Sequence, residues 1–508
     1  MDDSHVRRCP CLKVGFMFIA LTINNAVSTI VSSQSGDIEG IAVTLRNGIV
    51  HQFKGIPYAK PPVGPLRFKK PVQHPPWNNI LNATEYGPSC VQASHGEHMY
   101  PISEDCLFLN VYVPTEVSAK ANKSVMVWIY GGAFISGTAS NYDGSLLALH
   151  GDVIVVTFNY RLGVLGFFST GDSNAKGNYG LWDQIEALKW VKSNIEHFGG
   201  NPESITLFGE SAGAFCVSHH AINPANKGLF HRVIMQSGSV HTVAAVTSYP
   251  ADAASTLGEY LNCSDADNSE SLVACLREKD VSTLHQISEL VYALPALRKY
   301  LGLFLPFGPV IDGELIPDQP STLMQNRSSE QFRFYQSLDV ISGCTSAEGS
   351  ILVMNIYLFP VVSLPEANIS DGIPSWIPRL FIEPLVETFY NNDSSVLQHV
   401  YDRYTSPDSA EQGRLLVNLM GDTHFYTPML KSLLDHDNNE NINSTTYQFY
   451  FTRPSKMDAL IGVPPEWFEG ATHTADLAYL FHSDSLSNDD AVLSATMMSY
   501  WVNFAKYG

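Results

Sequence analysis

The sequence predicts an α/β fold in which a large, mostly parallel sheet carries helices on both faces. Two continuous apolar runs, 125–130 and 153–158, are typical of strands that are buried on both faces. Apolar residues then recur with helical spacing over 179–198, and Gly199-Gly200 ends that helix. Buried strands that alternate with helices imply helices on both sides of the sheet.

The elements before this region are expected to be short strands joined by turns. Asn47-Gly48 separates the apolar runs 41–45 and 49–53, which is a hairpin signal. The segment 57–76 is too rich in proline for regular structure, and 107–113 alternates as a strand should.

The C-terminal half is less regular. A further strand is expected at 232–236, and the half after residue 250 is expected to supply lid segments and more sheet. The chain has 508 residues, but no repeat, low-complexity block or linker divides it. We therefore expect one large domain over 34–508.

The strongest local signal for chemistry is Gly209-Glu210-Ser211-Ala212-Gly213, between the apolar run 205–208 and a segment of helical type. Strand, tight turn and helix form the context that a G-x-S-x-G motif needs to expose a reactive serine. Side chains at the glycine positions would collide with the neighbouring strand and helix, and backbone N–H groups at the helix start can face a carbonyl oxygen. The motif alone is weak evidence, but its setting predicts a nucleophile at Ser211.

Composition excludes some classes of function. The net charge of −20 argues against a nucleic-acid partner, and the 45% apolar content is ample for a deep core. We expect no metal site, because the His219-His220 doublet lacks both the i, i+4 spacing and nearby thiolates.

The N-terminus has the layout of a secretory signal peptide over 1–33. Basic residues precede the apolar run 14–23, and small residues follow, with cleavage expected after Ser28 or near Ser33. The run is too short to span a bilayer, and no other stretch is long and apolar enough to do so.

In a secreted protein, cysteines can form disulfides and Asn-x-Ser/Thr sequons can be glycosylated. Cys90 with Cys106 and Cys263 with Cys275 could each close a short loop, worth about 3 kcal/mol in the chain-entropy model. Cys216 is expected to be a buried free thiol, and Cys344 has no evident partner. Seven Asn-x-Ser/Thr sequons occur, at Asn82, Asn122, Asn262, Asn326, Asn368, Asn392 and Asn443.

Motifs in a fixed order carry a resemblance to a known family. They are Phe53–Phe68, Ser103–Asn110, Asn159–Phe167, Gly177–Gln184, Phe198–Pro202, Met235–Ser239 and Val310–Glu314. On these stretches the chain resembles the carboxylesterase/cholinesterase family of α/β-hydrolases from about Gly40 to its last residue. The resemblance implies hydrolysis of small-molecule carboxylic esters without a metal or organic cofactor.

The resemblance also supplies the partners of Ser211. Glu348 matches the acid of the catalytic triad and His473 matches the base, in the Ser, acid, His order of this fold. Without the resemblance, each would be equally well explained as an ordinary carboxylate or loop histidine. Glu210, next to the nucleophile, matches a position that lies in the site of relatives and assists hydrolysis.

The oxyanion hole is expected in the segment 128–134. By resemblance its backbone N–H donors are Gly132 and Ala133, together with Ala212. Two positions depart from the family pattern. Ala133 stands where many relatives have a third glycine, and Thr474 stands where glycine usually follows the histidine.

The sequence favours esters other than choline esters. Cholinesterases place a tryptophan between the first cysteine pair, as a cation–π platform for the ammonium group. The stretch 91–105 contains no tryptophan, and its only aromatic residue is Tyr100. The acyl-pocket positions align with Leu303 and Leu305, which suggests room for a larger acyl group, although ordinary core packing explains them equally well.

The sequence thus predicts a secreted serine esterase. Two alternatives stay open: a catalytically inactive adhesion or receptor ectodomain, because this fold is reused in that way, and a binder that sequesters reactive esters or organophosphates by acylating once.

Overall fold

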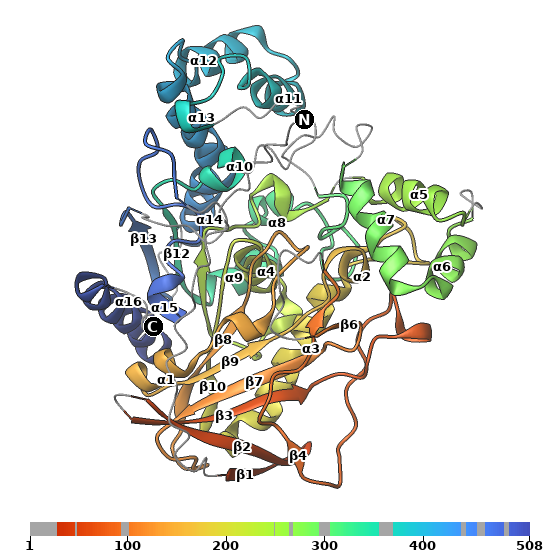
Figure 1. Ribbon diagram of the computed structural model, residues 1–508, viewed down its shortest axis with the longest axis vertical. Coiled ribbons are helices and arrows are strands. Elements are labelled where there is room, and N and C mark those ends of the chain that lie inside the picture. Colours follow the sequence, from red (N-terminus) through yellow and green to blue (C-terminus); the bar gives the residue numbers. More distant parts are fainter. Residues whose placement is uncertain are drawn as a thin grey trace, which may run out of the picture.

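The computed structural model describes residues 28–45, 48–92, 101–247, 249–263, 268–293, 305–354, 369–437, 443–454, 463–481 and 487–508. Most of the expected leader, Leu303 and Asn368 lie outside these ranges. The dominant feature of the described part is one large twisted sheet surrounded by helices (Figure 1).

The strands of this sheet follow the order β1-β2-β3-β7-β9-β8-β10-β11-β12-β13, with β4 beside β2. From β9 to β13 all neighbours are parallel, whereas the pairs β1–β2, β2–β3, β3–β7 and β7–β9 are antiparallel, the first two of them as hairpins. The strands are β1 (Ser28–Ser33), β2 (Gly36–Leu45), β3 (Gly48–Pro57), β4 (Leu81–Asn82), β7 (Phe108–Pro114), β8 (Lys123–Ile129), β9 (Ile154–Phe158), β10 (Gly200–Glu210), β11 (Arg232–Gln236), β12 (Asp339–Thr345) and β13 (Thr446–Phe451); β5 (Ser89–Cys90) and β6 (Ile102–Ser103) form a separate pair.

The predicted parallel region is confirmed. The apolar runs become β8 and β9, whose residues from Val125 to Ile129 and from Ile154 to Phe158 are completely buried. The mixed character of the whole sheet comes from the antiparallel pairs that β1, β2, β3 and β7 make.

Helices pack around this sheet and form the remaining layers. They are α1 (Ser145–Gly151), α2 (Gly163–Phe167), α3 (Tyr179–Asn194), α4 (Ala212–Ala221), α5 (Pro250–Tyr260), α6 (Ser269–Glu278), α7 (Val281–Ala293), α8 (Pro320–Gln325), α9 (Glu330–Gln336), α10 (Ser350–Met354), α11 (Arg379–Tyr390), α12 (Ser394–Tyr404), α13 (Ser409–Gly421), α14 (Thr427–Asp437), α15 (Ala478–Phe481) and α16 (Asn488–Tyr507). Helices α11, α12 and α13 gather at the top of Figure 1, where a second apolar cluster that includes Ile382 and Leu416 lies apart from the main core. This cluster begins at Ala347, beside one of the predicted site residues.

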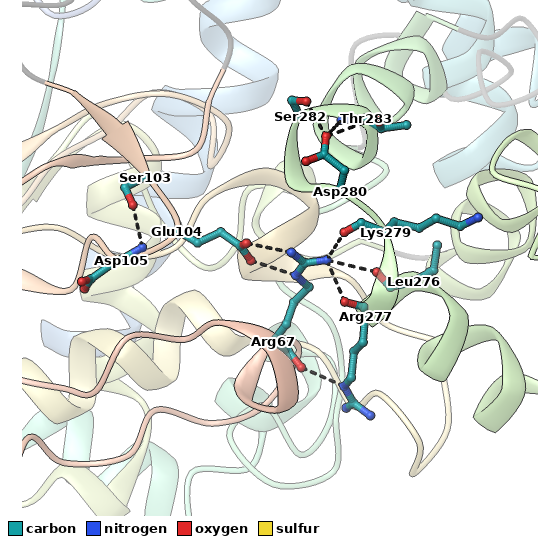
Figure 2. A network of polar contacts seen from close by, with 10 residues as sticks. All are labelled: Arg67, Ser103, Glu104, Asp105, Leu276, Arg277, Lys279, Asp280, Ser282 and Thr283. Atoms are coloured by element: carbon teal, nitrogen blue, oxygen red, sulfur yellow. Dashed lines mark hydrogen bonds and ion pairs between the residues drawn. The ribbon is translucent and has the colours of Figure 1, made fainter.

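A buried arginine fastens two disulfide-bearing segments together (Figure 2). The Arg67 guanidinium donates to both carboxylate oxygens of Glu104, at 2.8 and 2.7 Å, just before Cys106. Its Nη1 also donates to three carbonyl oxygens where α6 ends, those of Leu276, Arg277 and Lys279. A planar fork with five donors fits this arrangement, and a lysine would not.

The structure joins both expected cysteine pairs. Cys90–Cys106 and Cys263–Cys275 are disulfides, and Cys216 and Cys344 are buried free thiols. The asparagines of the six described sequons, Asn82, Asn122, Asn262, Asn326, Asn392 and Asn443, are all exposed.

Strand β1 bears on the two predicted cleavage positions. It pairs with β2 from Ser28 to Ser33, so cleavage near Ser33 would remove an ordered edge strand, whereas cleavage after Ser28 would leave most of it. Cleavage itself stays a prediction. Among the described helices, none combines the length and apolarity needed to cross a membrane.

Candidate active site

Ser211 occupies a strained turn between β10 and α4. Its φ of 55° and ψ of −126° lie in a region that residues with a Cβ rarely adopt. A Cβ on Gly209 would come within 2.7 Å of the Gly213 backbone, and one on Gly213 would come within 2.1 Å of the Ile129 oxygen. The glycines are therefore required by close packing of backbone against backbone, as the motif predicts. The Ser211 N–H donates to the Gln236 oxygen at 2.9 Å and ties the turn to β11.

Glu348 follows β12 and is completely buried. One carboxylate oxygen, Oε1, accepts the Thr345 N–H at 2.6 Å and the Ser237 hydroxyl. The other, Oε2, lies 2.5 Å from Nδ1 of His473. With three donors around it, the carboxylate is held in one orientation and its charge is compensated.

The backbone around His473 is hydrogen-bonded to the segment that carries Glu348. Thr472 forms a β-bridge with Ala347, and the His473 N–H donates to the Ser350 hydroxyl at 2.9 Å. The structure thus brings together two residues that are separated by 125 positions in the sequence.

The other nitrogen of His473 faces the elbow. Nε2 lies 3.2 Å from Oε1 of Glu210, the chain neighbour of Ser211. Within the described part of the chain, no hydrogen bond joins Nε2 to the Ser211 hydroxyl. Catalytic hydrogen bonds are often long or poorly aligned without substrate, so this geometry still permits acyl transfer.

The site concentrates buried carboxylates around one imidazole. Burial raises the pKa of Glu210, and the charges of Asp476 and Glu348 add to this while His473 opposes it. Burial alone lowers the pKa of His473, but Glu210 and Glu348 outweigh it, so the net pKa lies above the ordinary histidine value. The arrangement therefore favours an imidazolium, which is the state that a general base reaches after it takes a proton.

The predicted oxyanion segment lies against Ser211. A Cβ on Gly131 would come within 3.0 Å of the Ser211 Cβ and 2.9 Å of Glu210 Oε2. Among the described residues, no hydrogen bond uses the N–H groups of Gly132, Ala133 or Ala212. Ala212 begins α4, where a helix leaves its N–H groups without internal partners. These three donors are therefore free to bind a developing oxyanion.

Both departures from the family pattern lie in left-handed backbone. Ala133 has a φ of 54° and Thr474 a φ of 73°, a conformation that costs a residue with a Cβ about 1–2 kcal/mol. It is rarer still for a β-branched residue such as threonine. The glycines expected at these positions would remove the strain.

We expect Thr474→Gly to stabilise the protein by about 1 kcal/mol, because relief of the strain exceeds the entropy that glycine adds to the unfolded chain. Urea unfolding measures the change. Thr496→Gly is the matched control, since Thr496 lies within α16, where glycine should destabilise by up to about 1 kcal/mol. If both substitutions destabilise the protein equally, the backbone at Thr474 is not strained.

Only one of the two predicted acyl-pocket residues can be placed in the structure. Leu303 lies outside the described residues. Leu305 is half-buried against the main core, and its carbonyl accepts the Thr247 hydroxyl at 2.7 Å. No described contact links it to Ser211 or His473.

Sequence reasoning missed the residues that hold the predicted acid and base in place. Ser237 and Ser350 hold Glu348 and His473, and Gln236 donates to the buried Asp476 at 2.7 Å. Ser237 lies inside the Met235–Ser239 motif, which is the only signal that pointed to it. Among the described residues there is no cluster of three or more side chains that could hold a metal ion.

Comparison with known proteins places the chain in a family. The profile of the carboxylesterase family matches residues 27–508. Bovine (Bos taurus) bile salt-activated lipase is 36% identical over 501 residues, which cover 94% of this chain and 79% of the lipase. Acylcarnitine hydrolase of Mus musculus is 33% identical over 508 residues, which cover 94% of this chain and 83% of the hydrolase. Neuroligin-3 of Mus musculus is 35% identical over 561 residues, covering 99% of this chain and only 64% of the neuroligin. The chain therefore belongs to the carboxylesterase family.

Proposed function

We propose that this protein is a secreted serine hydrolase that cleaves carboxylic esters through an acyl-enzyme on Ser211. The observation that carries the proposal is the buried Glu348–His473 pair, whose other imidazole nitrogen lies 3.2 Å from Glu210, the chain neighbour of Ser211 in its strained turn. A base held in this way, next to a serine on a tight elbow, is the arrangement that nucleophilic acyl transfer requires.

The first half of the reaction forms the acyl-enzyme. Ser211 Oγ attacks the ester carbonyl carbon while His473 Nε2 takes the hydroxyl proton. Glu348 keeps Nδ1 protonated and stabilises the imidazolium. The carbonyl oxygen becomes an oxyanion and binds the free N–H groups of Gly132, Ala133 and Ala212, each worth about 3 kcal/mol to the transition state.

The second half releases the acid. The tetrahedral intermediate collapses, His473 gives its proton to the leaving alcohol, and the acyl group stays on Ser211. Water then attacks the acyl carbon as His473 takes its proton, and the collapse of this second intermediate restores the Ser211 hydroxyl. Glu210, 3.2 Å from Nε2, is proposed to favour the imidazolium in both halves.

The names of two relatives support ester hydrolysis, since one is a lipase and the other an acylcarnitine hydrolase. The absence of tryptophan from 91–105 disfavours choline esters as the main substrates. Two disulfides and six exposed sequon asparagines support a secreted protein, because disulfides persist in oxidising compartments.

Neuroligin-3, at 35% identity, favours a second candidate: a non-catalytic protein that binds other molecules. The contacts of His473 with Glu348 and with Glu210, the neighbour of Ser211, argue against it. The departures at Ala133 and Thr474 leave a third candidate open, a protein that sequesters reactive esters by acylating once and turning over slowly.

Active-site labelling separates these candidates. The purified protein is treated with a fluorophosphonate, and peptide mass spectrometry is combined with assays of 4-nitrophenyl butyrate and acetylthiocholine. We expect one label per chain on Ser211 and turnover of the nitrophenyl ester well above that of acetylthiocholine. Labelling without turnover would favour the sequestering protein, and neither labelling nor turnover would favour the non-catalytic one.

A further inference from the structure

A single π-turn interrupts the long helix that runs from α13 into α14. The turn covers Asp422–Tyr426, directly between the end of α13 at Gly421 and the start of α14 at Thr427. Such turns are rare, and they occur mostly as single insertions in α-helices, frequently at functional sites.

Pro428 explains why the turn forms here. In an α-helix, the N–H of residue 428 would donate to the His424 carbonyl, but proline has no N–H. The His424 oxygen instead accepts the Thr242 hydroxyl at 2.9 Å, and the Thr427 N–H donates to Asp422, five residues earlier. Pro428 therefore removes one α-helical hydrogen bond at the point of the interruption.

The π-turn is tied to the elements that carry the candidate triad. The Tyr426 hydroxyl donates to the Thr345 oxygen at 2.6 Å, and the N–H of Thr345 is one of the donors to Glu348. The Tyr404 hydroxyl donates to Asp422 at 2.6 Å and fixes the other end of the turn. The backbone that presents Phe425 is thus fixed relative to Glu348.

Phe425 projects from this turn onto the imidazole of His473. The two ring centroids are 5.0 Å apart with an interplanar angle of 50°, and Phe425 is 6% exposed. Charged groups reach the same imidazole from other directions: Glu348 at Nδ1, Glu210 near Nε2, and Asp476 three residues further along the chain. The hydrogen bond fixes one edge of the imidazole, whereas Phe425 limits its tilt.

We propose that Phe425 is a positioning residue for His473, which holds the imidazole ring toward Ser211 and stabilises its charged form through the π-electrons of the benzyl ring. The role rests on the proposed esterase function. Aromatic rings attract cations electrostatically, and the attraction is stronger where water is excluded. An aliphatic side chain of similar size would fill the space without this attraction.

Kinetics of Phe425→Leu and Phe425→Tyr on 4-nitrophenyl butyrate test the proposal. We expect Phe425→Leu to lower kcat about tenfold with KM changed less than twofold, and Phe425→Tyr to stay within threefold of wild type. The midpoint of the acid limb of kcat/KM should fall in Phe425→Leu, because the imidazolium loses stabilisation. Unchanged kcat and an unchanged midpoint in Phe425→Leu would overturn the proposal.

A second variant covers the case in which Phe425→Leu fails to fold. Pro428→Ala restores the missing N–H and lets the helix re-form its bond to His424, which moves Phe425 off the imidazole. We expect kcat to fall at least fivefold while the melting temperature does not fall. Full activity in a stable Pro428→Ala protein would overturn the positioning role.

A readout without substrate separates this inference from the esterase proposal. The low-field proton resonance on Nδ1 of His473, assigned by its loss in His473→Gln, reports the titration of the imidazole. We expect it to titrate at lower pH in Phe425→Leu than in wild type. If wild type hydrolyses no ester, the proposed function fails, whereas an unchanged titration in Phe425→Leu overturns the role of Phe425 itself.

Discussion

Ser211→Ala should lower kcat for 4-nitrophenyl butyrate by about 10⁴- to 10⁶-fold. The substitution removes only the hydroxyl oxygen, so the proposed nucleophile is lost while His473, Glu348 and the proposed oxyanion donors remain. Alanine keeps the Cβ that already tolerates the φ of 55°, so the elbow and its packing are retained. We expect the unfolding free energy to stay within about 1 kcal/mol of wild type.

A serine from the same helix provides the control for Ser211→Ala. Ser218 is completely buried on α4, and its hydroxyl accepts the Val240 N–H at 3.0 Å. Ser218→Ala should cost about 1–3 kcal/mol of stability by leaving that N–H without a partner, and kcat should stay within threefold. Substantial activity in Ser211→Ala, with Ser218→Ala behaving as expected, would remove Ser211 from the mechanism.

The parts of the fold that were predictable share a local physical cause. Continuous apolar runs predicted β8 and β9, because a strand that is buried on both faces carries apolar side chains on both. The elbow was readable for a similar reason, since Gly209 and Gly213 are required by contacts with immediate neighbours. Strand β13 gives no such signal, because most of its residues are half-buried or exposed at the edge of the sheet.

The rest of the site depends on contacts between distant parts of the chain. Glu348 and His473 were assigned by resemblance alone, since nothing local distinguishes a triad carboxylate from a surface one. Ser237 lies 111 positions from Glu348, and Ser350 lies 123 positions from His473. Pro428 was visible in the sequence, but its effect on Phe425 depends on Thr242, which lies 182 positions from His424.

Glu348→Gln should lower kcat by about 10⁴-fold while the protein stays folded. The carboxylate accepts three donors, from Thr345, Ser237 and His473, whereas glutamine has one acceptor oxygen and an N–H₂ group. One of the three groups that donate to Glu348 must then point at the glutamine N–H₂ group, which is itself a donor. If that donor is Nδ1 of His473, the imidazole takes the other tautomer and Nε2 can no longer accept the Ser211 proton. The mismatch should also cost about 1–3 kcal/mol of stability.

The pH profile and a matched variant test whether charge on Glu348 is the cause. Glu210 and Glu348 raise the pKa of His473, so the acid limb of kcat/KM in wild type should have its midpoint above the ordinary histidine value of 6.5. Loss of the Glu348 charge removes part of that increase, and the midpoint should move to lower pH. Asp476→Asn makes the same chemical change at a buried carboxylate that bonds Gln236, and it should lower kcat less than tenfold. Equal losses in the two variants would show that burial of any charge nearby, rather than the contact with Nδ1, supports catalysis.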